Sequence, residues 1–432
     1  MAEPTSNWGR NHRFSPSRWV HPAHEDEVAE IVRRVNAEGG RLKPLGGGHS
    51  WSDAAVTTGV QVRLDRMNRL LEVGPGEALA EAGMRLRDFN DALADAGYAL
   101  SVVGSIDQQH LGGIIATGTH GSSLIHGNLS SAVTRLALVT GAGDPEDLGP
   151  EHPHLPAARV GLGALGIVTR VGMRVEPAFR IAETTERVTF ARGVESLATF
   201  GREAEWAKVW WLPHTDAVLL FRGERTTAAS TFSPRMRAFE EAVLHAHVFG
   251  GVVRLGDKVR SAVPTLNRLV AAIHFRPRKV VGRSDHVLTM GMPPMHRESE
   301  WAVPVERGAE FVQRLRDEIE RLRLRVNFVV EARYVRGDSA WMSPAYGRDS
   351  LQVGIYIGDS ADLPAYYALG ARLAEELDGR PQWGKEADVD AATVARVFPR
   401  AADFRALSEA LDPRGVLRNP FLDRVLGPRT TT

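Results

Sequence analysis

Cysteine is absent from all 432 residues of the chain. This absence excludes a disulfide-stabilised scaffold and metal sites built from thiolates, and it is consistent with a reducing compartment. Long apolar runs are absent too, because no window approaches the ~18 apolar residues of a membrane span and the first residues contain no apolar signal-peptide core. We therefore expect a soluble, cytoplasmic protein without a membrane segment.

An excess of either charge is also lacking. Lysine and arginine together number 53, and aspartate and glutamate together number 53. Binding to nucleic acid or to an anionic surface requires clustered basic residues, whereas the arginines here are spread along the chain. We expect no nucleic-acid partner. The length predicts two domains, because single cores rarely grow beyond ~250–300 residues.

Two glycine-rich loops lie in the N-terminal part of the chain. The first, residues 41–53, reads RLKPLGGGHSWSD and places three glycines directly before His49. Glycines turn sharply and leave backbone N–H groups free to face an anion such as a pyrophosphate, and His49 adds an imidazole nitrogen at the edge of that cradle. Taken alone, this motif equally describes a turn followed by a surface histidine.

The second loop, residues 104–123, reads GSIDQQHLGGIIATGTHGSS and contains five glycines around one short apolar run. Two such loops in one domain favour a dinucleotide held along its length. The elements before the first loop run helix (22–38), strand (41–45), loop. A nicotinamide-binding fold would instead run strand, G-x-G-x-x-G, helix, so this order argues against a Rossmann domain.

The remaining N-terminal pattern predicts a compact α+β domain. Strands are expected at 60–64, 79–82 and 133–139, a helix at 86–96 and a polar surface loop at 141–156. After Pro177 the pattern changes to a second domain with an antiparallel sheet and helices on one face. Its expected elements are the apolar segment 209–220, a weakly periodic helical region 232–283, a helix at 310–323, and strands at 326–335 and 350–357.

An acid and a base share one face of the expected strand 326–335. Glu331 and Arg333 are two residues apart, and side chains in a strand alternate between its faces. A solvated ion pair on an edge strand is the plain alternative, because such pairs are common. The chemical alternative is a pair that acts on a substrate, in which one group takes a proton and the positive charge stabilises developing negative charge.

Five motifs give the chain a family resemblance. They are GGGHS (46–50), ATGTHG (116–121), GLGALGIVT (161–169), QWGK (382–385) and LDPRGVLRN (411–419). With these, the sequence resembles the vanillyl-alcohol-oxidase type of flavoproteins, and within it the sugar-1,4-lactone oxidases and alditol oxidases. The resemblance spans nearly the whole chain in the family's order.

The resemblance implies an α+β, two-domain, PCMH-type FAD-binding fold. The implied parts are an FAD-binding domain (11–177), a substrate or cap domain on an antiparallel sheet (178–394), and a C-terminal segment that returns to the FAD domain (395–432). It also implies a covalent bond from His49 to the 8α-methyl of FAD. The residues that it assigns to cofactor binding are Pro44, Leu45, Gly46, Gly47, Gly48, His49, Ser50, Gly104, Ser105, His110, Gly113, Thr117, Gly118, Thr119, His120 and Ile167.

The implied catalytic residues are Glu331, Arg333 and Lys385. Glu331 and Lys385 would handle the hydroxyl proton, and Arg333 would stabilise the reduced flavin and hold a substrate oxygen. The implied substrate contacts are Ser105, Glu331, Arg333, Tyr356, Gln382 and Lys385. Two of them depart from the pattern, since Gln382 replaces a usual histidine and Tyr356 replaces a smaller threonine of the alditol enzymes. His120 has no second ligand at a metal spacing, so we expect a loop-ordering hydrogen bond there and no metal.

The implied activity is oxidation of a CH–OH group of a sugar 1,4-lactone of the L-gulono, L-galactono or D-arabinono type. Hydride would pass to flavin N5 and electrons to dioxygen, giving hydrogen peroxide. Alternatives are an alditol (xylitol or sorbitol) oxidase, a lactone dehydrogenase with another acceptor, and a catalytically weak flavin-binding protein. WWLPHTD (210–216) resembles the lactone branch and WMSPAYGRDS (341–350) the alditol branch. Gly104 matches a position where oxygen-reactive members carry glycine, although backbone angles alone could also require it.

Overall fold

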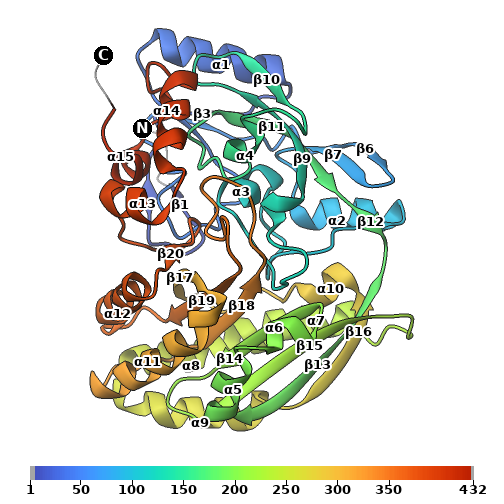
Figure 1. Cartoon of the computed structure of the whole chain (residues 1–432), viewed down its shortest axis with the longest axis vertical. Helices are drawn as coiled ribbons and strands as arrows, with labels where there is room; N and C mark the ends of the chain where they lie inside the picture. The colour runs from blue at the N-terminus through green and yellow to red at the C-terminus, as the bar shows by residue number, and fades with distance from the viewer. Residues whose placement is uncertain (1–4, 430–432) are drawn as a thin grey trace.

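A computed structural model describes residues 5–429, except for the side chains of residues 244–246. Figure 1 shows two stacked parts, with several small sheets above and one large twisted sheet below. The upper part contains the N-terminal elements together with the helices at the C-terminal end. The predicted α+β class with an antiparallel second sheet is confirmed. The exact domain bounds stay a prediction.

The first elements of the upper part surround a small parallel sheet. Helix α1 (Glu25–Ala37) begins with three acidic residues and buries Val28, Ile31, Val32 and Val35. Gly39, with φ of 66°, ends it as the sequence predicted. Strands β3 (Arg18–Val20), β5 (Val60–Val62) and β4 (Leu42–Pro44) form a parallel sheet in that order, and β4 leads into the first glycine loop. The short strands β1 (Thr5–Ser6) and β2 (Arg13–Phe14) pair beside it.

A five-stranded antiparallel sheet follows, in the order β10-β9-β11-β7-β6. Its strands are β6 (Leu70–Gly74), β7 (Glu77–Glu81), β9 (Val133–Val139), β10 (Pro145–Leu148) and β11 (Ile167–Arg174). The accompanying elements are α2 (Leu86–Asp95), β8 (Tyr98–Ala99), α3 (Leu111–Ala116), η1 (Leu129–Ala132), α4 (Leu155–Ala158) and β12 (Glu176–Pro177). The expected surface loop 141–156 was wrong in part, because Leu148 and Leu155 are buried and anchor β10 and α4.

The large sheet contains eight antiparallel strands in the order β16-β13-β15-β14-β18-β19-β17-β20. Their bounds are β13 (Arg180–Thr189), β14 (Trp206–Trp211), β15 (Ala217–Thr226), β16 (Arg278–Arg283), β17 (Arg297–Pro304), β18 (Val330–Val335), β19 (Ser350–Ile357) and β20 (Arg380–Pro381). The strand expected at 350–357 is confirmed. The apolar segment 209–220 forms parts of two strands, β14 and β15, joined by a turn.

Helices cover both faces of the large sheet, whereas the sequence predicted one. Buried residues of α11 (Gly308–Arg321) and α12 (Leu363–Glu376) join the main core together with Val218 and Leu220 of β15. On the other face, Ala271 of α9 (Val263–His274) packs with Leu219 and Phe221. Other helices of this part are α5 (Phe190–Ser196), α6 (Phe200–Glu203), α10 (Ser284–Leu288) and η4 (Val305–Arg307).

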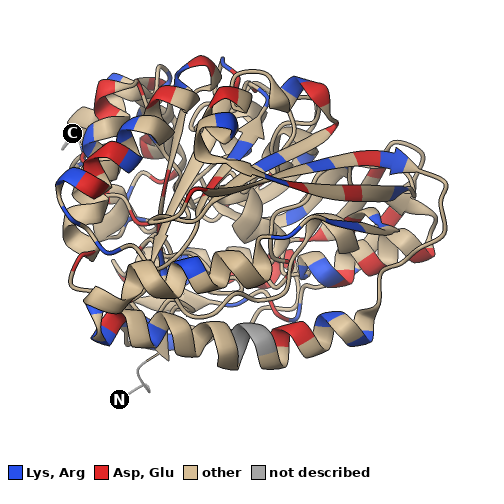
Figure 2. Cartoon of the chain, turned by 90° about the horizontal axis from the view of Figure 1, so that it is seen from below, with Lys and Arg blue, Asp and Glu red and all other residues tan. Residues whose placement is uncertain are grey.

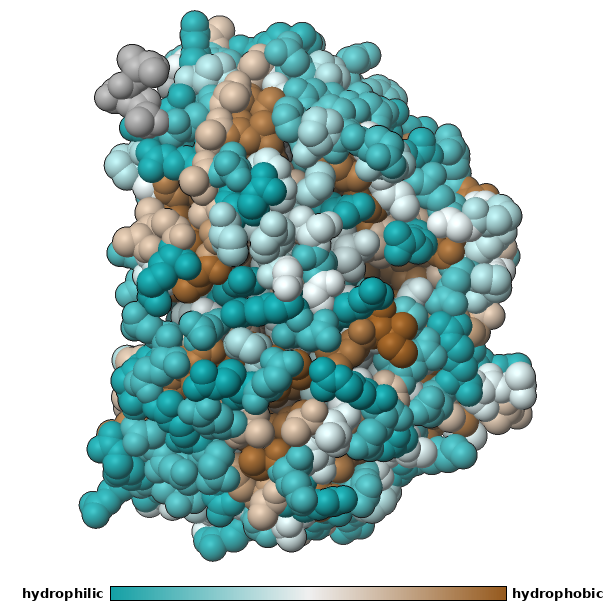
Figure 3. Space-filling model, viewed as in Figure 1, coloured by the Kyte–Doolittle hydropathy of each residue, from teal (hydrophilic) through white to brown (hydrophobic). Residues whose placement is uncertain are grey.

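The region expected to be helical at 232–283 contains a nearly continuous helical run before strand β16. It consists of α7 (Pro234–Phe239), the π-helical η2 (Glu240–Phe249), α8 (Gly250–Lys258), η3 (Arg260–Ala262) and α9. The run lies along the lower edge of Figure 2. In Figure 3, which has the same view as Figure 1, the surface is mostly hydrophilic, with apolar residues in small separate groups. Among the described residues, no helix is long and apolar enough to cross a membrane.

The last helices lie against the N-terminal part of the chain. They are α13 (Ala391–Val397), α14 (Ala401–Leu411) and α15 (Pro420–Leu426), drawn in red near α1 in Figure 1. The buried Lys43 Nζ donates hydrogen bonds to the carbonyl oxygens of Gly163 at 3.1 Å and Leu417 at 3.2 Å. This one side chain therefore joins β4 to the GLGALGIVT and LDPRGVLRN motifs. Burial lowers its pKa to about 7.

Candidate active site

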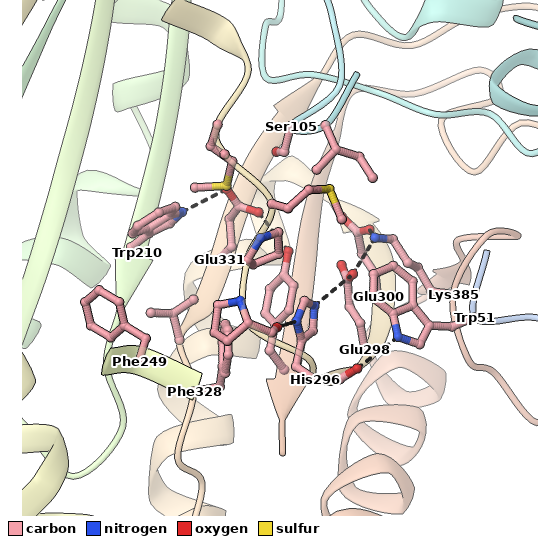
Figure 4. Close-up of a pocket in the computed structure, with 18 of the residues that line it drawn as sticks. Trp51, Ser105, Trp210, Phe249, His296, Glu298, Glu300, Phe328, Glu331 and Lys385 are labelled. Carbon is pink, nitrogen blue, oxygen red and sulfur yellow. Dashed lines mark hydrogen bonds and ion pairs between the residues drawn. The ribbon is translucent and has the colours of Figure 1, made fainter. Parts of the chain in front are cut away.

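Two adjoining cavities meet at His49, Ser50, Gln109 and Thr117, which line both. The first cavity lies against the large sheet and is shown in Figure 4. The second lies among the glycine-rich loops and the GLGALG segment. The upper and lower parts of the molecule thus share one continuous site, at the place where the sequence put His49.

Strand register lines up the polar side chains of the first cavity. Glu331 of β18 lies opposite Trp210 on β14 and Gly354 on β19, and Gly354 lies opposite Glu300 on β17. Cross-strand neighbours project from the same face of a sheet. A single row across four strands therefore carries the two carboxylates to one wall of the cavity.

Glu331 and Arg333 form a buried ion pair on the central strand β18. Glu331 Oε2 lies 3.3 Å from Arg333 Nε, and the two side chains are 5% and 7% exposed. Burial acts to raise the pKa of Glu331, but Arg333 and the hydrogen bonds to the carboxylate outweigh it, so this pKa lies below its usual value. Burial acts to lower the pKa of Arg333, but Glu331 and Glu300 outweigh it, so this pKa lies above its usual value. Both groups are ionised, and the pair is not the solvated edge-strand pair that the sequence left open.

Trp210 and Tyr356 hold the Glu331 carboxylate in place. Trp210 Nε1 donates a hydrogen bond to Oε1 and the Tyr356 hydroxyl donates to Oε2, each at 2.8 Å. Burial raises the pKa of Tyr356 well above its usual value, so the phenol keeps its proton. A Cβ at Gly354 would lie 2.9 Å from the Tyr356 ring, so glycine at 354 lets the ring cross to Glu331.

Lys385 points into the same cavity from the QWGK segment. Its Nζ lies 2.5 Å from Glu298 Oε2, 3.9 Å from Glu300 Oε2 and 4.6 Å from the centre of the Trp51 ring. Glu298 and Glu300 are each only 1% exposed. Burial acts to raise the pKa of Glu300, but His120 and Arg333 hold it well below its usual value. Lys385 therefore sits at the end of a buried chain of alternating charges.

Ser105 and His120 bring the second glycine-rich loop to Arg333. Arg333 Nη1 donates to Ser105 Oγ at 3.0 Å and to the His120 carbonyl at 3.4 Å. His120 Nε2 lies 3.0 Å from Glu300 Oε1, and its Nδ1 lies 2.9 Å from the Gly121 carbonyl. These are loop-ordering contacts of the kind that we expected for His120.

Gln382, the departure from the family pattern, binds backbone groups. Its Nε2 donates to the carbonyl oxygens of Thr117 at 3.1 Å and Gly118 at 3.4 Å, and its Oε1 accepts from Gly384 N at 2.5 Å. The side chain is 3% exposed but lines the cavity. Gln382 therefore fixes the QWGK segment to the ATGTHG loop without needing a charge, and its contact with substrate stays a prediction.

The second cavity has the features that FAD requires. A Cβ at Gly47 would lie 2.8 Å from the Gln108 carbonyl, so glycine allows the two loops to approach closely. At Gly48 and Gly113 nothing lies within 4 Å of such a Cβ, so their backbone faces open space. His49 Nδ1 is buried without a hydrogen-bond partner among the described residues, and burial lowers the pKa of His49 to about 4. A neutral, unpartnered imidazole nitrogen beside an open glycine cradle fits a flavin dinucleotide.

The other predicted cofactor residues divide into two groups. Those that line a cavity are Pro44, Leu45, Gly46, Gly47, Gly48, His49, Ser50, Ser105, His110, Gly113, Thr117, Thr119 and His120. Gly104, Gly118 and Ile167 do not line either cavity. Ile167 is fully buried in β11. The assignment of these three residues to cofactor binding stays a prediction.

Sequence reasoning missed Glu298, Glu300, Trp210 and Trp51. The signal for the two glutamates was present, because HRESEWAVP places them two residues apart before a run typical of a strand. Strand β17 was not predicted because its first half is charged. Trp210 was noticed only as part of an apolar segment, and its partner Glu331 is 121 residues away in sequence.

Comparison with known proteins agrees with this geometry. Residues 171–425 match the D-arabinono-1,4-lactone oxidase family, and residues 16–149 match the FAD-binding domain. The chain belongs to the D-arabinono-1,4-lactone oxidase family. It is accordingly an FAD-dependent oxidoreductase, and the GGGHS loop lies within the matched FAD-binding domain.

Relatives of known name cover the whole length of this family member. The chain is 30% identical to the L-gulonolactone oxidase of Scyliorhinus torazame, over 98% of both chains. It is also 30% identical to the L-gulono-1,4-lactone dehydrogenase of Mycobacterium tuberculosis, over 99% of this chain and all of that one. A solvent-stable cholesterol oxidase superposes with a TM-score of 0.84 at 16% identity, over 99% of this chain and 98% of that one, which shows a shared fold.

Proposed function

We propose that the protein oxidises a CH–OH group of a sugar 1,4-lactone, with FAD bound covalently through His49. The observation that carries this proposal is that the buried Glu331 and Arg333 and the partly buried Lys385 surround one cavity that also reaches His49. The names of the relatives support a sugar lactone as the substrate. When bound, FAD supplies the acceptor for the hydride that leaves the alcohol carbon.

The residues divide the remaining work. The ionised Glu331 carboxylate accepts the hydroxyl proton, and Trp210 and Tyr356 keep it oriented. Arg333, held by Glu331 and Ser105, supplies the fixed positive charge that stabilises developing negative charge. Lys385, beside Glu298, shares the handling of the hydroxyl proton with Glu331. Three carboxylates face two cations here, so a neutral lactone is favoured over an anionic sugar acid.

A panel of donors tests this function. L-Gulono-, L-galactono- and D-arabinono-1,4-lactone, xylitol and sorbitol are each added anaerobically to the yellow protein, and bleaching is followed together with peroxide formed in air. We expect the fastest bleaching with a lactone. Faster bleaching by the alditols would favour an alditol oxidase, and bleaching by none would favour a catalytically weak flavoprotein.

His49→Ala is expected to abolish covalent attachment and to weaken activity. Within residues 5–429 the imidazole Nδ1 has no hydrogen-bond partner and burial keeps the ring neutral at pH 7, and a neutral imidazole is a nucleophile for the 8α-methyl. Wild-type protein denatured in acid and separated from small molecules should keep its yellow colour, whereas the variant should release it. The matched control His110→Ala, which changes another histidine of the second cavity, should keep the colour bound. Release of free FAD by the wild type would refute the attachment.

Gly104→Ala is expected to slow reoxidation of the reduced flavin by oxygen severalfold, with anaerobic reduction nearly intact. Gly104 has no positive φ, so its backbone does not require glycine. An added Cβ would lie 3.0 Å from Thr119 Cγ2 and would press Thr119 toward the cavity that it lines. Stopped-flow absorbance measures both half-reactions, and Gly149→Ala, whose Cβ would meet nothing within 4 Å, is the control. A wild type that is reoxidised slowly by air but rapidly by a dye would instead be a dehydrogenase.

A further inference from the structure

The first cavity has two chemically different ends. Its polar end is the wall formed by Ser105, Glu298, Glu300, Glu331, Arg333 and Lys385. The other end, which we call the apolar limb, is lined by Leu212, Leu219, Phe249, Val253, Val270 and Phe328. In Figure 4, Phe249 and Phe328 lie on one side of the cavity, and Lys385 and Trp51 lie on the other. A ligand held at the polar end can therefore extend into the limb.

The apolar limb is a built part of the fold. Ala271 of α9 and Phe275, which directly follows this helix, pack with Leu219 of β15 and with Leu212, which directly follows β14. Val253 of α8 is 6% exposed and faces this space. At the outer end, the Phe249 ring lies 4.3 Å from the His274 ring, centre to centre.

The limb offers few hydrogen-bonding groups to a sugar. Two amides and the His274 imidazole line it, and both amides are bonded within the protein. Asn267 Nδ2 donates to the Pro213 and Val326 carbonyl oxygens, each at 2.9 Å, and Asn327 Nδ2 donates to Asp257 Oδ1 at 2.7 Å. Hydroxyl groups placed there would lose hydrogen bonds to water without replacement. Each methylene placed there instead tightens binding about fourfold.

We propose that the apolar limb binds an acyl or alkyl chain carried by the alcohol donor. The substrate class then includes sugar lactones or polyols with an apolar substituent, whose oxidised carbon lies at the polar end. The identity of the polar head rests on the proposed function. The acyl or alkyl substituent is inferred from the limb alone, because the limb opens from the cavity of Glu331 and Lys385 and not from a separate cavity.

A chain-length series tests the limb. L-Gulono-1,4-lactone and its 6-O-acetyl, 6-O-butanoyl and 6-O-hexanoyl esters are titrated calorimetrically into holoenzyme that has been reduced under nitrogen, so that no turnover occurs. We expect Kd to fall about fourfold per methylene, and therefore roughly 250-fold over the four methylenes that separate acetyl from hexanoyl. A Kd that is flat or rises with chain length overturns the proposal, and this series needs no variant.

Variants test whether the effect of chain length on Kd arises in the apolar limb. Val253→Thr combined with Val270→Thr keeps side-chain shape but adds hydroxyls to the limb, and it should lower the acetyl-to-hexanoyl ratio of Kd severalfold or more relative to wild type. Val259→Thr, at an exposed position directly after α8, is the matched control and should leave the ratio unchanged. An unchanged ratio in the double variant places the chain elsewhere and overturns the proposal.

The proposed function is scored separately, by bleaching of oxidised enzyme with the parent lactone. If the parent lactone bleaches the enzyme but chain length has no effect on Kd, the proposal for the apolar limb is overturned and the proposed function stands. A chain-length effect without bleaching by any lactone supports the limb and overturns the function. If alkylated benzoquinones show the chain-length effect and the esters do not, the limb serves an electron acceptor and the proposal is overturned.

Discussion

Glu331→Gln is expected to lower the rate constant of anaerobic flavin reduction by about 10²–10⁴-fold, the usual contribution of a general base. Glutamine has the same shape and still accepts the hydrogen bond from Trp210, but it cannot take the hydroxyl proton. Arg333 keeps Glu300 Oε1 within 3.6 Å, so its charge remains paired. Flavin content should therefore stay close to wild type while stopped-flow reduction slows.

Trp210→Phe is the control for this variant. It removes one hydrogen bond to the carboxylate without removing the charge, so the loss should be much smaller. The pKa of Glu331 lies below its usual value, so the carboxylate should remain ionised from neutral pH down to about pH 4.5, the usual pKa of glutamate. A loss of only a fewfold in Glu331→Gln would remove Glu331 from the chemistry.

The pairing of Glu331 with Arg333 could be predicted because the information is local. Two residues at a spacing of two in a strand share a face whatever the rest of the chain does. Local patterns of apolar residues likewise predicted helix α1 and the strands at 133–139 and 350–357. The glycine cradle before His49 was likewise local, since three successive glycines dictate a turning backbone.

Burial of Glu298 and Glu300 could not be predicted in the same way. A carboxylate becomes buried only where cations compensate it, and here those cations come from Lys385 and Arg333 on other segments. From the sequence alone, the segment RESEW (297–301) is typical of the solvated end of a strand. The register of strands β18, β19 and β17 places this segment in line with Glu331, so that it forms part of the wall of the first cavity.

The apolar limb was hidden for a related reason. Its residues come from the turn after β14, from β15, from the helical run and from the segment just before β18, and none of these segments is unusual alone. The weak periodicity of 232–283 is explained by the π-helical η2, because a π-helix has a different number of residues per turn from the α-helices α7 and α8 on either side of it. Both the polar end and the limb are thus products of contacts between distant segments.

Lys385→Met is expected to depress turnover by about 10²–10⁴-fold, with flavin binding much less affected. The substitution also leaves Glu298 without its 2.5 Å partner, and a buried carboxylate without its cation destabilises a protein by ~3–5 kcal/mol. Part of any loss could therefore come from the site losing its shape. The double variant Lys385→Met with Glu298→Gln separates the two causes, because it removes both charges of the pair. If Lys385 acts on the substrate, the double variant should recover thermal stability and remain as slow in anaerobic flavin reduction as Lys385→Met alone. Recovery of the reduction rate together with stability would show that Lys385 serves only to neutralise Glu298.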